Sequence, residues 1–161
     1  MDRLRGFWSF LAIAAAVLLA LRLAHVAVPV VFPETLPGPI AAATLEEARR
    51  RAGFAPLVPS YRPESLGMGP SEMAVTLSPY PTFTIAWRNA GHELSVTQRR
   101  GGPRPAQPAL ARPLAGLAGS AWWTDGPRSH LVIPRDGFWV HIETTLPATE
   151  LRRFADTLTP S

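Results

Sequence analysis

The sequence AWWTDGPRSHLVIPRDGFWVHIET, residues 121–144, decides the fold that this chain is expected to adopt. Apolar and polar side chains alternate along it, which predicts three β-strands at residues 118–124, 129–133 and 138–144. Turn-forming residues separate the strands at Asp125–Arg128 and at Pro134–Gly137. Two antiparallel hairpins are therefore expected to follow one another.

One face of these hairpins is predicted to enter the core. In the register that a turn at 134–137 sets, Ile133 lies opposite Phe138 and Leu131 lies opposite Val140. Trp122 is expected beside Leu131 on the same face.

The opposite face gathers the candidate binding residues. They alternate with the core positions and comprise Trp123, Arg128, His130, Trp139, His141 and Glu143, together with Val132. The same register predicts that His130 lies directly across from His141, and that Arg128 lies across from Glu143.

The two histidines allow two interpretations. Imidazoles about 5 Å apart at their β-carbons on neighbouring strands can share a divalent metal, with Glu143 as a third ligand. Two histidines without a firm third ligand equally fit a wet sheet face beside an ion pair. We favour the second interpretation and predict no metal and no cofactor.

Trp123 and Trp139 also allow two interpretations. They suggest an aromatic contact surface for a protein, a glycan or a lipid. Alternatively, the long loop or the first helix covers them, since such large side chains are often buried.

Upstream, a meander of strands precedes these hairpins. Alternation predicts strands at residues 73–78, 83–88 and 93–97, the last two joined by a turn that sets Arg88 opposite Glu93, Trp87 opposite Leu94 and Ile85 opposite Val96. Glycine and proline then predict a long mobile loop at residues 99–113.

Two amphipathic helices complete the predicted domain. TLEE at residues 44–47 is typical of a capping box, and Gly53 is expected to end that helix. A second helix is predicted over Pro147 to Leu158. We expect an α+β fold in which both helices cover one face of a curved antiparallel sheet of about six strands.

The N-terminal segment is predicted to lie in a membrane. Residues 6–28 supply the roughly 20 apolar residues that a spanning helix needs, with Arg22 at the far interface. Arg3 and Arg5 predict that residues 1–5 form a cytoplasmic tail. A proline-rich stalk at 29–43 then leads to an extracytoplasmic domain at 44–161.

A cleaved signal peptide is the alternative for this segment. The small residues that cleavage requires do not follow the apolar run closely, since Ala41 to Ala43 comes about twenty residues too late. We therefore predict an uncleaved, single-pass anchor in the cell membrane.

Composition narrows the function classes. The chain has no cysteine, which excludes disulfides, thiolate chemistry and cysteine-ligated zinc. Its net charge of +4 is modest and scattered, so we expect no nucleic-acid partner. No serine lies in a nucleophile elbow and no glycine-rich loop precedes a helix, so we predict no catalytic residues and no enzyme.

Three stretches together resemble a bacterial family of membrane-anchored extracytoplasmic domains of unknown function. They are TLEEARRRAGFAPLVPSYRPESL at 44–66, AWWTDGPRSHLVI at 121–133 and LPATELRRFADTL at 146–158. Such domains occur at the C-terminal end of proteins similar to anti-sigma factors, and look distantly like the curved sheet of lipoprotein carriers. The resemblance carries over no catalytic residue. With only residues 1–5 in the cytoplasm, this chain is expected to lack an anti-sigma domain of its own.

Two functions follow as expectations. The first is a non-enzymatic interaction or sensing module that docks an envelope or membrane protein through the outer face of the sheet or the long loop. The second is a carrier or chaperone for a lipid or lipoprotein, which needs an unfilled apolar cavity. Trp87, Trp122, Phe83, Phe138 and Phe154 are large enough to fill such a cavity.

Overall fold

A computed structural model describes residue 17 and residues 38–161 of the chain. The predicted cytoplasmic tail at 1–5, the anchor at 6–28 apart from Val17, and the stalk as far as residue 37 lie outside the described residues. Among the described residues, no helix is long and apolar enough to cross a membrane.

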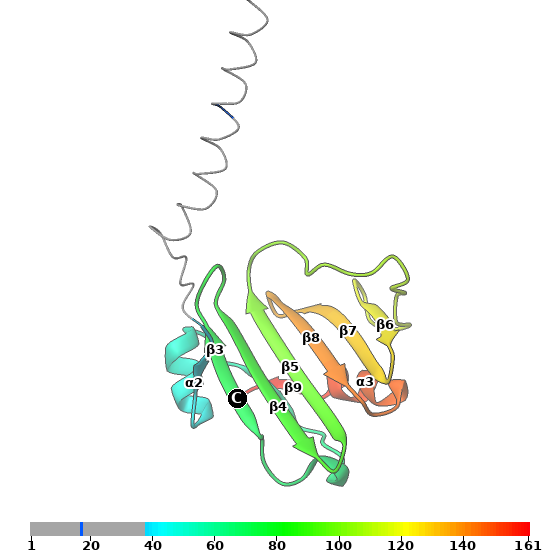
Figure 1. Cartoon of the computed structure of the whole chain (residues 1–161), viewed down its shortest axis with the longest axis horizontal. Coiled ribbons are helices and arrows are strands. Elements are labelled where there is room, and N and C mark those ends of the chain that lie inside the picture. The colour runs from blue at the N-terminus through cyan, green and yellow to red at the C-terminus, as the bar shows by residue number, and fades with distance from the viewer. Residues whose placement is uncertain (1–16, 18–37) are drawn as a thin grey trace, which may run out of the picture. The chain divides into compact units, whose positions relative to one another are not determined.

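Residues 38–161 form an α+β domain built on a large antiparallel sheet (Figure 1). Seven strands follow the order β1-β3-β4-β5-β8-β7-β6, namely β1 (Ile40–Ala41), β3 (Glu72–Thr76), β4 (Thr82–Asn89), β5 (His92–Arg100), β8 (Phe138–Thr144), β7 (Arg128–Arg135) and β6 (Ala121–Asp125). Two further strands, β2 (Leu57–Pro59) and β9 (Leu158–Pro160), pair in a small second sheet. The helices are α2 (Leu45–Ala52), α3 (Ala148–Asp156) and a 3₁₀ turn, η1 (Glu64–Leu66).

The capping box predicted at the start of α2 is confirmed. The Glu47 amide donates to the Thr44 hydroxyl at 3.1 Å, and the Glu47 carboxylate accepts from the Ala43 amide at 2.9 Å. Gly53 ends the helix with a left-handed φ of 72°, a backbone conformation that favours glycine.

The β4–β5 hairpin has the predicted register. Arg88 pairs with Glu93, Trp87 with Leu94, and Ile85 with Val96. Like side chains face each other across the hairpin, as expected for a pair of strands with one buried face.

The β7–β8 register differs from the prediction by two residues. Ile133 pairs with Val140 and Leu131 with Ile142, because β7 continues through Pro134 to Arg135. The turn consists of Asp136 and Gly137 alone, whose φ angles of 51° and 81° suit a tight two-residue hairpin loop. Trp122 pairs with Leu131 as predicted.

Two short edge elements lie outside the predicted boundaries. Strand β1 pairs with β3, and Ala42 is buried, so the folded domain begins within the segment assigned to the stalk. Helix α3 ends at Asp156, and Leu158 belongs instead to β9. Strands of two or three residues are too short for alternation to be recognised in the sequence.

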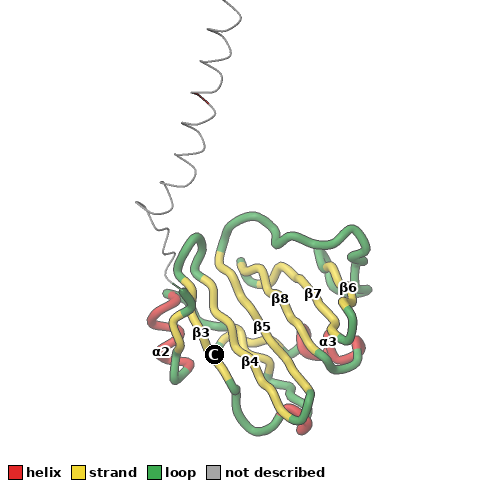
Figure 2. Tube along the Cα trace, viewed as in Figure 1, coloured by secondary structure: helices red, strands yellow, loops and turns green. Residues whose placement is uncertain are grey.

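One face of the large sheet forms the core. Its buried side chains include Phe83, Ile85, Trp87, Leu94, Val96, Leu131, Ile133, Val140 and Ile142. Ala48 and Ala52 of α2 and Leu151, Phe154 and Ala155 of α3 pack into the same cluster, so both helices cover this inner face as predicted. Figure 2 shows α3 behind the sheet and no helix across the face turned to the viewer.

A buried glutamine fastens the small sheet to the inner face. Gln98 is fully buried on β5, and its side-chain oxygen accepts from the Leu57 amide of β2 at 2.5 Å. Its amide nitrogen donates to the Leu57 carbonyl. Both polar groups are thereby satisfied, as burial requires.

Candidate functional site

The outer face brings the six predicted binding residues onto neighbouring strands. Trp123 lies on β6, Arg128 and His130 on β7, and Trp139, His141 and Glu143 on β8. Because the register is shifted, His130 pairs with Glu143 and His141 pairs with Val132, so the predicted direct pairs are wrong. The predicted partners nevertheless meet as diagonal neighbours, which long side chains can reach across a sheet.

Three aromatic rings cluster toward the β6 edge of this face, and we call them the Trp123 stack. The ring of Trp123 lies parallel to that of His130, with 5.0 Å between centroids and 7° between planes. His141 completes the stack at 5.7 Å from Trp123 and 5.5 Å from His130.

The two imidazoles share a hydrogen bond that suits neutral rings. His130 Nδ1 and His141 Nε2 are 3.3 Å apart, so one nitrogen donates and the other accepts. Burial lowers the pKa of His141 below its usual range, the charge of His130 lowers it further, and Glu143 opposes both effects. A carboxylate oxygen of Glu143 lies 3.9 Å from His130 Nδ1.

The three residues of the candidate metal site have other partners in the structure. The two imidazoles meet edge to edge through their hydrogen bond, and the Glu143 carboxylate is bound by Arg128 Nη1 at 2.6 Å. Within residues 38–161, no group of three or more histidine, aspartate or glutamate side chains is arranged to hold a metal ion. His130 Nε2 is buried and has no hydrogen-bond partner in this part of the chain.

The connection between β5 and β6 reaches both half-buried tryptophans of the outer face, Trp123 and Trp139. It passes along the end of the sheet where β5 ends, as Figure 2 shows. The indole nitrogen of Trp139 donates to the Gly102 carbonyl at 3.3 Å, and the Arg104 guanidinium lies 5.8 Å from the Trp139 ring centroid. Near β6, the same connection places Leu110 beside Trp123 in a hollow of about 270 Å³.

The connection frames these rings without closing over them. Between Tyr80 and Trp139 it leaves a hollow of about 390 Å³, here called the Tyr80–Trp139 hollow. Its walls include Thr76, Tyr80, Arg99, Pro105, Trp139 and His141. The hollow therefore borders the Trp123 stack through His141.

Gly102 holds the two walls of this hollow together. Its φ is +76°, and a β-carbon there would come within 2.8 Å of the Tyr80 ring. Its carbonyl is the acceptor for Trp139, so one residue contacts both aromatic walls. Only glycine allows this close approach.

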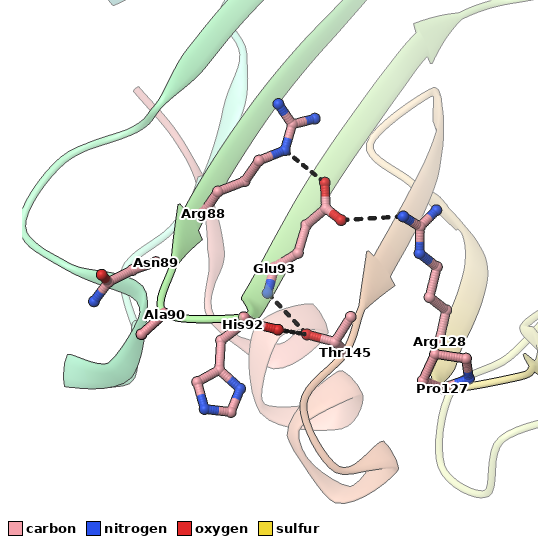
Figure 3. Close-up of a pocket in the computed structure, with 9 residues that line it drawn as sticks. Arg88, Asn89, Ala90, His92, Glu93, Pro127, Arg128 and Thr145 are labelled. Atoms are coloured by element: carbon pink, nitrogen blue, oxygen red, sulfur yellow. Dashed lines mark hydrogen bonds and ion pairs between the residues drawn. The ribbon is translucent and has the colours of Figure 1, made fainter.

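A second arginine-lined hollow, of about 500 Å³, lies at the opposite end of β4 and β5 (Figure 3). Here Glu93 accepts from Arg88 Nε at 2.7 Å and from Arg128 Nη2 at 3.3 Å. Glu72 is a further partner of Arg88, and Glu143 of Arg128. The positive charge at this end is compensated by carboxylates.

Tyr80, Arg99 and Pro105 are site residues that the sequence analysis did not identify. Tyr80 stands in a turn between two prolines, and Arg99 and Pro105 flank Gly101-Gly102-Pro103. Tyr80 and Pro105 lie in a turn and a loop, as their prolines indicated, whereas Arg99 was wrongly assigned to the loop at 99–113, because β5 continues to Arg100. The path of the twenty-residue connection after β5 has no periodic signal.

The comparisons with known proteins give no family. No protein-family model matches the chain, and no curated protein matches its sequence.

Proposed function

We propose that this protein is a membrane-tethered, extracytoplasmic interaction module that docks an envelope or membrane protein on the outer face of its sheet. The observation that supports this function is the contrast between the two faces. The inner face is packed against both helices, whereas the outer face keeps Trp123 and Trp139 half-buried at the rims of hollows. Aromatic side chains in such positions are typical anchors of protein interfaces.

The membrane tether is part of the proposal. Residues 6–28 would span the bilayer, with residues 1–5 in the cytoplasm and the domain outside. A reporter enzyme that works only outside the cytoplasm, fused after Ser161, is expected to be active, and the chain is expected to resist extraction by alkaline carbonate. An active reporter on a chain that carbonate releases would favour a cleaved segment instead.

The family resemblance belongs to the same proposal. Helix α2 leads into the proline-flanked strand β2, and the β6–β7 hairpin precedes the final helix, which is the order that the resembling stretches imply. This order supports membership of that extracytoplasmic family.

A lipid or lipoprotein carrier is the weaker candidate. A carrier would hold its cargo in the hollow of a curved sheet, but Phe83, Phe154 and Trp87 are buried there against the helices. Opening this face would expose the main core of the domain.

Site-specific photo-cross-linking in native membranes tests the docking function. A photoreactive residue at Leu110, which is 83% exposed beside Trp123, is expected to capture one discrete protein. Met68 is a matched control, because it is 93% exposed in the loop between η1 and β3. The Leu110 product should disappear in a Trp123→Ala, Trp139→Ala double variant.

Three outcomes would contradict docking. Equal products from positions 110 and 68, or a product that survives the double variant, would mean that the outer face is not the interface. Captured lipid without a protein would favour the carrier.

A further inference from the structure

The arginines at the two ends of the outer face differ in their partners. Arg88 and Arg128 each bind two carboxylates. Arg99 and Arg104, at the Tyr80–Trp139 hollow, form no ion pair within residues 38–161, and none of the residues that line this hollow is acidic. Of these two pairs of arginines, the pair at the Tyr80–Trp139 hollow is therefore the one without carboxylate partners among the described residues.

These two arginines lie over aromatic rings and leave hydrogen-bonding capacity unused. The Arg99 guanidinium is 5.3 Å from the Tyr80 ring centroid and donates through Nη2 to the Pro103 carbonyl, while its buried Nε has no partner. Arg104 lies over Trp139 and donates through Nη2 to the Gly119 carbonyl at 3.0 Å. Its Nε donates to the side-chain oxygen of Gln107 at 2.7 Å, so its Nη1 is the nitrogen that has no partner among the described residues. An arginine that stacks on a ring keeps other N–H groups at its edge for a carboxylate.

The walls of the hollow suit a flat apolar segment. Pro79 and Pro105 join Tyr80 and Trp139 in lining it. The hydroxyls of Thr76 and Ser78 form no hydrogen bond with any described residue, so they are free to bind a peptide backbone. Grooves lined by aromatic rings bind extended proline-containing segments, because these segments lose little entropy on binding.

We propose that the Tyr80–Trp139 hollow binds an extended, acidic, proline-containing segment of the partner protein. Its proline ring lies between Tyr80 and Trp139, and its carboxylate pairs with Arg99 and Arg104. This inference rests on the proposed docking function and names the chemistry that the partner must supply.

The hollow lies at the end of the sheet where β1 begins. Strand β1 pairs antiparallel with β3, with Ile40 opposite Val75, so the chain enters the domain beside the β3–β4 turn that carries Tyr80.

Fluorescent peptides test the inference on the full chain in nanodiscs of zwitterionic lipid. The probes are the peptide PPEPPEPP and its counterparts with glutamine or lysine in place of glutamate. The glutamate peptide is expected to bind about ten-fold more tightly than the glutamine peptide, and the lysine peptide not to bind. Added salt should weaken the glutamate peptide most.

Matched arginine variants assign the binding to this hollow. Arg99→Gln is expected to weaken the glutamate peptide about ten-fold and to reduce its salt dependence, whereas Arg88→Gln at the paired end leaves it unchanged. Arg104→Gln serves as the second variant if Arg99→Gln lowers the melting temperature.

Several outcomes would overturn the inference. These are equal binding of the glutamate and glutamine peptides, equal loss in Arg88→Gln and Arg99→Gln, and no peptide binding at all. Arg99-dependent binding of a hyaluronate tetrasaccharide in place of the peptides would assign the hollow to acidic glycans. If the Leu110 cross-link persists in any of these cases, docking stands and only the acidic segment is wrong; if that cross-link is also absent, the docking function fails.

Discussion

The two faces of the large sheet are formed by the same strands, but their side chains differ in burial and in their partners. Along β4, Phe83, Ile85 and Trp87 enter the core, while Arg88 on the outer face pairs with carboxylates. Along β8, Val140 and Ile142 are buried inside, while Trp139 and His141 lie half-buried outside. The inner face thus stabilises the fold, whereas the outer face presents aromatic, histidine and charged side chains.

The largest expected effect comes from opening the inner face. Phe154 of α3 is fully buried, so Phe154→Ala is expected to cost about 3–5 kcal/mol in unfolding free energy. Trp123→Ala on the outer face should cost clearly less, because the Trp123 ring is half-exposed. Urea denaturation of both variants measures this difference. Equal losses would mean that the outer stack is a second core rather than a contact surface.

A smaller loss of stability is expected from a substitution at Gly102, which contacts the outer-face hollow and not the core. Gly102→Ala forces a left-handed φ and a contact with the Tyr80 ring, at a cost of about 1–2 kcal/mol. Trp139 should become more accessible to acrylamide quenching as its Gly102 acceptor moves. Gly126→Ala is the control, because Gly126 also has positive φ but nothing within 4 Å of its β-carbon position. Similar quenching in both variants would show that Gly102 does not hold the hollow.

The pH dependence of stability tests the Trp123 stack. The pKa of His141 in the folded state lies below its ordinary value of 6.5, so the unfolded chain takes up protons first as the pH falls. This contribution to stability is complete above pH 6.5 and is lost as the pH falls through the folded-state pKa.

The melting temperature should therefore fall between pH 7 and pH 5 by more in the parent protein than in His141→Gln. The hydrogen-bonded partner His130 and the nearby Glu143 remain in the variant, so the difference reports His141 itself. A parallel decline in both proteins would contradict the lowered pKa of His141.

The smallest effect is expected at the paired arginine end. Glu93→Gln removes one carboxylate from Arg88 and from Arg128, but each arginine keeps Glu72 or Glu143. The side chains of Arg88 and Arg128 are 56% and 50% exposed, so solvent screens these ion pairs. The loss of unfolding free energy should therefore be at most about 1 kcal/mol, and it should shrink in high salt. Urea denaturation at low and high salt measures it. A loss as large as that of Phe154→Ala would mean that this ion-pair network stabilises the fold as strongly as a core side chain.

Much of the fold could be predicted from local patterns. The β4–β5 register followed from matching side chains across a short turn, and the start of α2 followed from Thr44 and Glu47. The β7–β8 register could not be fixed, because the four residues Pro134–Gly137 allow a two-residue turn as well as a four-residue one. A register shift of two residues keeps every side chain on its face, so the faces were right although the pairs were wrong.

The sequence by itself determined which residues share a face, since alternation along a strand is a local property. That property placed Trp123, His130, Trp139 and His141 together on the outer face. Only the tertiary structure decided that Tyr80 and Arg99 meet Trp139 across a hollow, and that two similar pairs of arginines have different partners. Such contacts join the β3–β4 turn, β5 and β8, and they depend on packing between segments that are distant in the chain.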